Sequence, residues 1–94
     1  KFKWAFPIYN IEKNCLMFFT HNTFDFVQTI EVVVNGEKIL HLECPPQTWK
    51  LNNLSDFNGE KNIEVIVNGN LNKKIKINES NKKIFTTNNY IVFN

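Results

Sequence analysis

Residues 30–44 read IEVVVNGEKILHLEC and residues 63–77 read IEVIVNGNLNKKIKI, and these two stretches decide the fold class. In each, β-branched residues alternate with other residues up to an Asn-Gly pair, which is typical of a strand that ends in a tight turn. Because Asn and Gly tolerate the positive φ angles of a type I′ turn, both stretches predict β-hairpins. The predicted hairpins join 30–34 to 38–44 and 63–67 to 71–77.

The register of the first hairpin is left open by the sequence. Pairing Ile30 with Leu42 and Val32 with Leu40 places apolar side chains opposite one another. The same pairing requires a left-handed conformation at Glu37, which suits that residue poorly. Turn chemistry and the apolar pattern therefore disagree here.

In the second hairpin the side-chain pattern favours a three-residue loop, Asn68 to Asn70. This loop opposes Ile63 with Ile75 and Glu64 with Lys74, so that apolar residues pair and opposite charges meet. A two-residue loop would place Val65 opposite Asn72. We therefore predict the three-residue loop.

The rest of the chain also predicts strands. Residues 1–6 alternate, and Pro7, which lacks an N–H, predicts an edge strand or a change of partner. Residues 13–20 are apolar on both faces, as in a central strand, and Pro45-Pro46 ends the strand that precedes it. The remaining predicted strands are 24–34, 47–51 around Trp49, 83–87 and 90–93, with a loop over 52–62.

Length and composition fit one small domain. The chain has 94 residues, 43% hydrophobic and 21% charged, with nine Phe and three Gly, a single Ala and no Arg. Only one hydrophobic core fits this length. Seven or eight short strands then predict an all-β fold, an antiparallel β-sandwich formed by residues 1–94.

The stretch from Ile30 to Asn68 resembles the immunoglobulin-like modules of bacterial surface and secreted proteins. It contains V-N-G at 34–36, Pro46 followed by Trp49 and Leu51, then Leu54 and Gly59 in the loop that follows, and an I-x-V-x-V strand at 63–67. The resemblance implies an immunoglobulin-like sandwich. Two family features are missing, namely an alanine-rich A-x-D segment after the last motif strand and a cysteine in 63–67.

The same resemblance implies a non-catalytic spacer, adhesion or accessory module, excised from a larger secreted or cell-surface protein, with a protein partner or a neighbouring domain. A cytosolic setting is left open. The sequons at Asn53 and Asn78 fit secretion, but a chain with sixteen Asn produces such motifs by chance. Cys15 and Cys44 allow either one disulfide or two thiols.

Catalytic and metal-binding groups are scarce, and we expect no enzyme, no cofactor and no metal site. Cys15 lies in an apolar segment, where a thiol acts as a small hydrophobic residue. His41 and Glu43 fall on one side of a strand and Cys44 on the other, so the three do not form a ligand set. Without Arg, sequence-specific nucleic-acid recognition is disfavoured. No apolar run reaches the roughly 20 residues of a membrane-spanning helix.

Two ligand-binding alternatives remain. A run of lysines could attract a polyanion, although lysines on a strand edge more often prevent aggregation. The exposed aromatic side chains of Trp49, Tyr9 or Tyr90 could bind a glycan, although we expect Trp49 to fill the core. The lysines are Lys73, Lys74, Lys76, Lys82 and Lys83.

Overall fold

The computed structural model describes residues 4–10, 12–56, 59–78 and 90–92, excepting the side chains of 56 and 90–92. These residues form strands, turns and loops, without a helix. The strands are β1 (Ala5–Asn10), β2 (Cys15–Asn22), β3 (Gln28–Val34), β4 (Glu37–Cys44), β5 (Thr48–Asp56), β6 (Lys61–Val67), β7 (Asn70–Ile77) and β8 (Tyr90–Val92).

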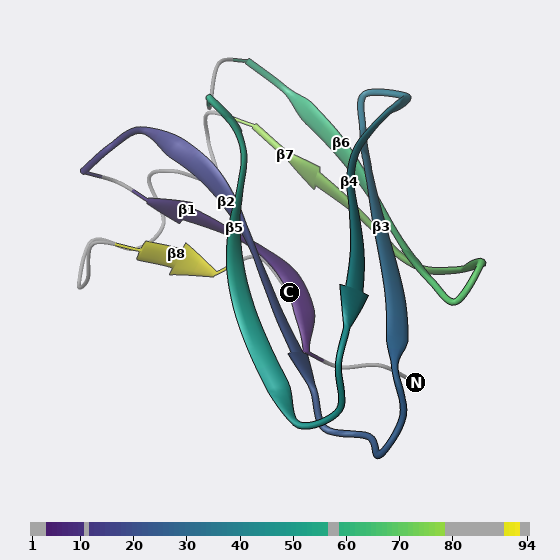
Figure 1. Cartoon of the computed structure of the whole chain (residues 1–94). Coiled ribbons are helices and arrows are strands. Elements are labelled where there is room, and N and C mark those ends of the chain that lie inside the picture. Colours follow the sequence, from purple (N-terminus) through teal and green to yellow (C-terminus); the bar gives the residue numbers. More distant parts are fainter. Residues whose placement is uncertain (1–3, 11, 57–58, 79–89, 93–94) are drawn as a thin grey trace.

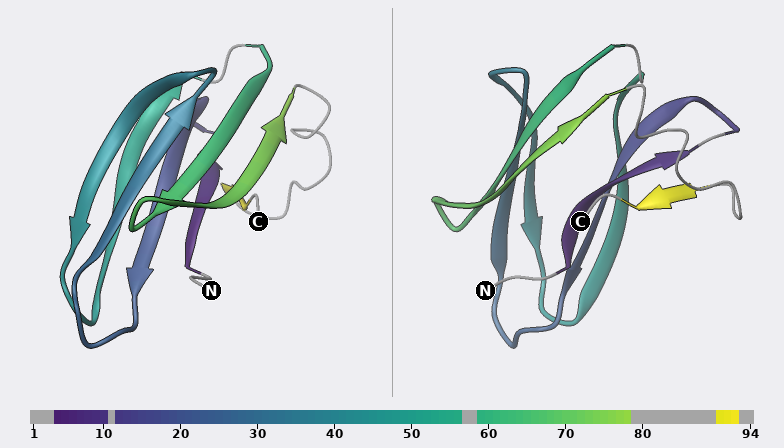
Figure 2. Two further views of the ribbon diagram at one scale, coloured as in Figure 1. Left: turned by 90° about the vertical axis from the view of Figure 1, so that its right-hand side faces the viewer. Right: turned by 180° about the vertical axis from the view of Figure 1, so that it is seen from behind.

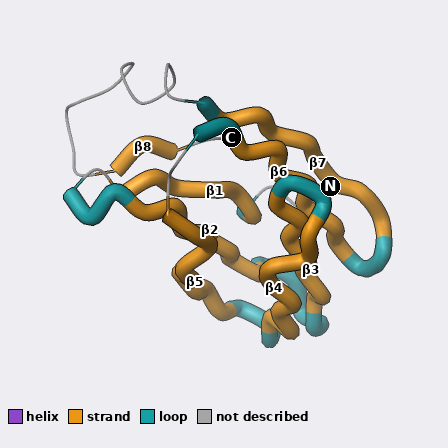
Figure 3. The backbone as a smooth tube through the Cα atoms, turned by 90° about the horizontal axis from the view of Figure 1, so that it is seen from above, coloured by secondary structure: helices purple, strands orange, loops and turns teal. Residues whose placement is uncertain are grey.

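The strands form two antiparallel sheets, shown in Figure 1. The first sheet has the order β5-β2-β1-β8, and the second has the order β4-β3-β6-β7. The view from above in Figure 3 shows the sheets as two layers, and the left view of Figure 2 faces the second sheet. The prediction of an all-β, antiparallel chain is confirmed.

One hydrophobic core lies between the two sheets. Each sheet supplies alternate residues of its strands to this core, as expected when strand side chains point in turn to opposite faces. The first sheet contributes Ala5, Tyr9, Leu16, Phe18 and Leu54, and the second contributes Ile30, Val32, Val34, Cys44, Ile63, Val65 and Ile77.

Both predicted hairpins form, each with a two-residue Asn-Gly loop. The φ angles are 50° and 83° at Asn35 and Gly36, and 49° and 83° at Asn68 and Gly69, as a type I′ turn requires. The predicted three-residue loop, Asn68 to Asn70, is therefore wrong, since Asn70 already pairs with Val67.

A β-bulge in each hairpin reconciles the tight turn with the apolar pairing. Ile39 is the extra residue in β4, and beyond it Val32 faces Leu40 and Ile30 faces Leu42. The extra residue in β7 is Asn72, which lies between the partners of Val65 and Ile66. Beyond each bulge, counted from the turn, the residues therefore pair with the partners that the apolar pattern predicts.

The heptapeptides IEVVVNG (30–36) and IEVIVNG (63–69) occupy equivalent positions in the second sheet, because β3 and β6 pair about Val32 and Val65. The asparagines of the two turns, Asn35 and Asn68, form equivalent hydrogen bonds between β3 and β6. The Asn35 N–H donates to the Asn62 carbonyl (2.9 Å), and the Asn62 N–H donates to Asn35 Oδ1 (2.8 Å). Asn68 makes the same two bonds with Thr29, both 2.8 Å long. The asparagines therefore close the turns and extend the central ladder.

Two segment boundaries differ from the prediction. Residues 52–56, predicted as loop, continue β5 because they pair with β2 across a bulge at Leu54. The strand predicted from residue 24 begins only at Gln28. The reason is Asn22, whose fully buried side chain fixes the preceding loop: its Oδ1 accepts the Phe24 N–H, and its Nδ2 donates to the carbonyls of Phe26 and Cys44.

The central position predicted for residues 13–20 is confirmed, since β2 lies between β1 and β5. Pro7 lies within β1, and the pairing of β1 with β8 covers only Ile8 to Asn10, so a partner joins after the proline as expected. The predicted strand 83–87 and turn residue Asn58 lie outside the described residues.

The edge strands β4, β5 and β7 each carry the extra residue of a bulge, at Ile39, Leu54 and Asn72. Bulges twist an edge away from a regular ladder and so hinder pairing with another chain. These edges are therefore poor templates for strand addition, which leaves the sheet faces as the larger regular surfaces.

Candidate functional site

The outer face of the first sheet carries an ordered set of uncharged side chains. We call it the aromatic face and define it by nine residues in three cross-strand rows. The rows are Trp4-His21-Trp49, Phe6-Phe19-Leu51 and Ile8-Met17-Asn53. Residues opposite one another in register point to the same side of a sheet, so each row forms a strip across β1, β2 and β5.

The rows follow from strand alternation and register. In β2, Leu16, Phe18, Thr20 and Asn22 are buried, so the residues between them face outward. The backbone N–H of His21 donates to the Trp4 carbonyl at 2.7 Å, which extends the ladder past the start of β1 and places Trp4 beside His21.

Both tryptophans of the aromatic face are exposed to solvent. The exposed fraction is 66% for Trp49, 45% for Trp4 and 39% for Leu51. The ring centroids of Phe19 lie 6.3 Å from Trp49 and 5.2 Å from Phe6, and Trp4 lies 6.3 Å from His21. The face thus holds two groups of neighbouring rings, Phe6-Phe19-Trp49 and Trp4-His21.

The prediction that Trp49 fills the core is wrong. Trp49 pairs with His21, whose side chain is on the outer side of β2, so the register itself turns the indole outward. The inner side of β5 instead carries Thr48, Lys50 and Asn52, which an edge strand tolerates because it is partly open to water. Trp49 is accordingly available as a ligand-binding residue.

The other aromatic candidates differ from Trp49. Tyr9 is 5% exposed, and its hydroxyl donates to Asn14 Oδ1 at 2.6 Å, so this tyrosine belongs to the interior. The side chain of Tyr90 lies outside the described residues. Phe24, Phe26 and Val27 are exposed in the β2–β3 loop, where the two phenylalanine rings contact each other at 5.4 Å.

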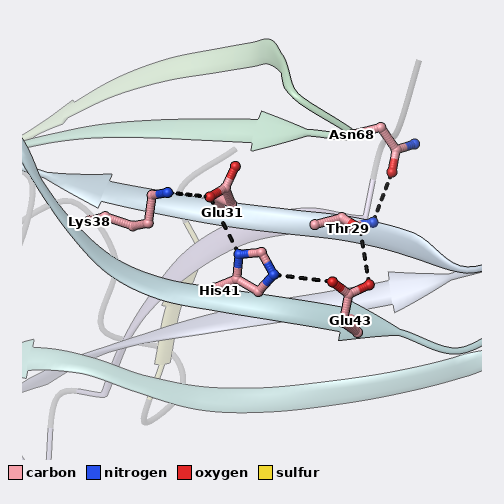
Figure 4. A network of polar contacts seen from close by, with 6 residues as sticks. All are labelled: Thr29, Glu31, Lys38, His41, Glu43 and Asn68. Atoms are coloured by element: carbon pink, nitrogen blue, oxygen red, sulfur yellow. Dashed lines mark hydrogen bonds and ion pairs between the residues drawn. The ribbon is translucent and has the colours of Figure 1, made fainter.

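The outer face of the second sheet is different, because it carries a network of charged side chains (Figure 4). His41 lies between two carboxylates, with Nε2 at 3.1 Å from Glu43 and Nδ1 at 3.4 Å from Glu31. Lys38 forms an ion pair with Glu31, and the Thr29 hydroxyl donates to Glu43 at 3.0 Å. The prediction that His41 and Glu43 share one side of a strand is confirmed.

The network shifts the titration of two of its members. Hydrogen bonds with Glu43 and then with Glu31 raise the pKa of His41 above its usual 6.5. Hydrogen bonds with Lys38 and then with His41 lower the pKa of Glu31 below 4.5. Both shifts favour the charged forms, so the chemistry of this surface is ion pairing among its own groups.

The lysine run is partly neutralised within the sheet. Lys73, Lys74 and Lys76 lie on the edge strand β7. The ammonium of Lys74 is 3.8 Å from Glu64 and that of Lys76 is 3.5 Å from Glu60. Lys82 and Lys83 lie outside the described residues. The described lysines thus occupy the edge position where lysine hinders strand addition.

Cys15 and Cys44 are free thiols, so the disulfide that the sequence left open is not formed. The Cys44 thiol lies 3.9 Å from the hydroxyl of Thr20, which is five residues along β2 from Cys15. At ~3.3 Å per residue, Cys15 is about 16 Å along the strand from Thr20, so the two cysteines are well beyond the reach of a disulfide. Burial raises the pKa of the Cys44 thiol, which makes it a weak nucleophile.

Metal-binding and membrane-spanning features are also absent from the described ranges. No three His, Cys, Asp or Glu side chains there come together as metal ligands. Those residues also contain no helix that is long and apolar enough to cross a membrane.

Comparison with known proteins adds no relationship: no protein-family model, no curated protein and no solved structure matches this chain significantly.

Proposed function

We propose that this chain is a non-catalytic, immunoglobulin-like interaction module of a larger protein and that the aromatic face is its contact surface. One observation carries the proposal: the nine residues that define the aromatic face hold no carboxylate or ammonium group, and Trp49 at one corner is 66% exposed. Aromatic and methionine side chains without charges are typical of the desolvated centre of a binding surface.

The strand order supports the immunoglobulin-like part of the proposal. In the constant-type arrangement, strands one, two, four and five form one sheet and strands three, six and seven form the other. Here β1, β2 and β5 share the first sheet, while β3, β6 and β7 share the second. β4 pairs with β3 instead of β5, and β8 joins β1, so the likeness covers six of the eight strands.

The placement of titratable groups supports a non-catalytic role. An active site usually gathers such groups in a cleft that shifts their pKa toward a catalytic task. Here Glu31 and His41 lie on an open sheet face, where their ion pairs favour the ordinary charged forms. Within the described part of the chain, the buried thiol of Cys44 has the Thr20 hydroxyl as its one hydrogen-bond partner.

The proposed location at a cell surface rests on the family resemblance and on the two sequons. Asn53 of the first sequon is exposed in β5, so its amide is accessible. The two thiols are unbridged and therefore lend no support to an oxidising compartment.

The proposal is tested by binding selections against the wild-type chain and the double variant Trp49→Ser/Leu51→Ser. A random peptide library and a panel of polysaccharides serve as probes, and Leu71→Ser, which changes an exposed leucine of the second sheet, is the matched control. We expect binders that recognise the wild type and the control but not the double variant. If no probe of either class depends on Trp49 and Leu51, the aromatic face is not a contact surface.

A further inference from the structure

We propose that the aromatic face binds a neutral glycan chain, with Trp49 and Trp4 as the stacking residues. This inference rests on the proposed function, because it names the ligand of the same contact surface. It is argued from the size of the face, its lack of charge and the kinds of groups in its three rows.

The size of the face disfavours a second protein molecule. Three strands about 4.8 Å apart, with rows of side chains about 6.8 Å apart, give a footprint on the order of 300 Å² once the side-chain margins are added. A specific protein interface covers about 800 Å² on each partner. Protruding side chains add to this area, but the aromatic face is still small for a stable dimer. Its size suits a few sugar residues.

The charge of the face points to a neutral ligand. The nearest lysine in β5, Lys50, pairs with the buried Thr20 and acts electrostatically on the Cys44 thiol, so it faces the inner side of the sheet. Among the nine residues, none is a lysine, an aspartate or a glutamate. An acidic glycan would find no fixed cation on this surface, whereas a neutral one needs none.

The chemistry of the rows matches a sugar ring. A pyranose presents C–H groups on its faces and hydroxyls around its edge, and the negative face of an aromatic ring attracts such C–H groups. Trp4 and Trp49 flank His21 in the first row, so rings that can stack lie beside a ring nitrogen that can bond a hydroxyl. Asn53 supplies an amide in the third row.

The chain offers a direct optical test, because its two tryptophans, Trp4 and Trp49, both belong to the aromatic face. Tryptophan fluorescence of the full chain is titrated with four neutral oligosaccharides: the hexaoses of cellulose, chitin, xylan and mannan. We expect at least one to shift the emission to shorter wavelength and to protect it from acrylamide. Trp49→Ala should weaken that binding about tenfold or more, because it removes one of the two stacking rings.

Phe26→Ala is the matched control, because Phe26 is 58% exposed but lies in the β2–β3 loop outside the aromatic face. This variant should bind like the wild type. Circular dichroism and the thermal midpoint of Trp49→Ala check that loss of binding is not loss of folding; Trp49→Phe, which keeps a ring, should retain most of the affinity.

The outcomes separate this inference from the proposed function. If no neutral oligosaccharide binds while peptides are selected in a Trp49-dependent way, the glycan inference is overturned and the contact surface stands. Equal binding by Trp49→Ala and the wild type would also overturn the inference. If neither sugars nor peptides depend on the face, both proposals fail.

Discussion

The outer faces of the two sheets differ in charge, although both belong to antiparallel sheets that cover the same core. On the second sheet, Glu31, His41 and Glu43 pair with one another and with Lys38. On the first sheet, the corresponding surface holds tryptophan, phenylalanine and methionine. An antiparallel sheet normally keeps one polar face toward water, so the second sheet follows the usual pattern and the first departs from it.

The exposed tryptophans of the aromatic face are not part of the core between the sheets. The inner residues of both sheets already supply the core, and the outside of the second sheet combines ion pairs with the exposed Leu71. An exposed tryptophan adds little to stability and increases the risk of association. Trp4 and Trp49 both lie on the first sheet, at the surface where we propose a contact with a ligand.

The largest effect is expected from a comparison of the two sides of the first sheet. Phe18 is fully buried, and Phe18→Ala should lower the free energy of unfolding by about 3–5 kcal/mol, because it leaves a cavity. Trp49→Ala removes a side chain that is 66% exposed and should cost less than about 1 kcal/mol. Denaturant unfolding measures both. Equal losses would mean that Trp49 is part of the core.

A smaller effect is expected from pH on the second sheet. The raised pKa of His41 contributes stability that is fully present below its unfolded value of 6.5 and is lost as pH rises through the folded pKa. The lowered pKa of Glu31 contributes stability that is present above 4.5 and is lost as pH falls. Between pH 4.5 and pH 6.5, the His41 and Glu31 contributions to stability are both present.

His41→Gln should therefore lower the thermal midpoint most near pH 5.5 and much less near pH 9, as read from melting curves across that range. Lys74→Met is the control, because the Lys74–Glu64 pair lies in the same sheet but contains no histidine. If the difference in thermal midpoint between the wild type and His41→Gln does not change with pH, the ion pairs of His41 do not contribute as proposed.

The smallest effect is expected from the Lys74–Glu64 pair itself. The ammonium and carboxylate are 3.8 Å apart, and the two side chains are 68% and 41% exposed. Solvent screens such a pair, so Lys74→Ala should change the free energy of unfolding by less than about 0.5 kcal/mol. A loss above 1 kcal/mol in denaturant unfolding would show that ion pairs hold the second sheet together.

The sequence predicts the hairpins well because their signals are local. Asn35-Gly36 and Asn68-Gly69 specify the turns through φ angles that other residues reach at a cost. The bulges at Ile39 and Asn72 were not predicted, because counting alternation assumes a regular ladder and cannot register an extra residue. The repeated heptapeptide was a readable signal, since its two copies differ at one position.

The aromatic face could not be predicted from local pattern. In β2 both sets of alternating side chains are largely apolar, so alternation alone does not say which set is buried. The direction of Trp49 depends on its pairing with His21, which is 28 residues away in sequence and is set by the packing of whole strands. Only the assembled first sheet shows that Trp4 and Trp49 share a row.

The most direct test of the contact surface is acrylamide quenching of a Trp4→Phe variant, in which Trp49 is the single tryptophan. With the indole 66% exposed in the free chain, the emission should lie near that of a solvated tryptophan and quench almost as efficiently as a free indole. An emission at short wavelength that resists acrylamide would show that Trp49 is covered, and would contradict an aromatic face open to a ligand.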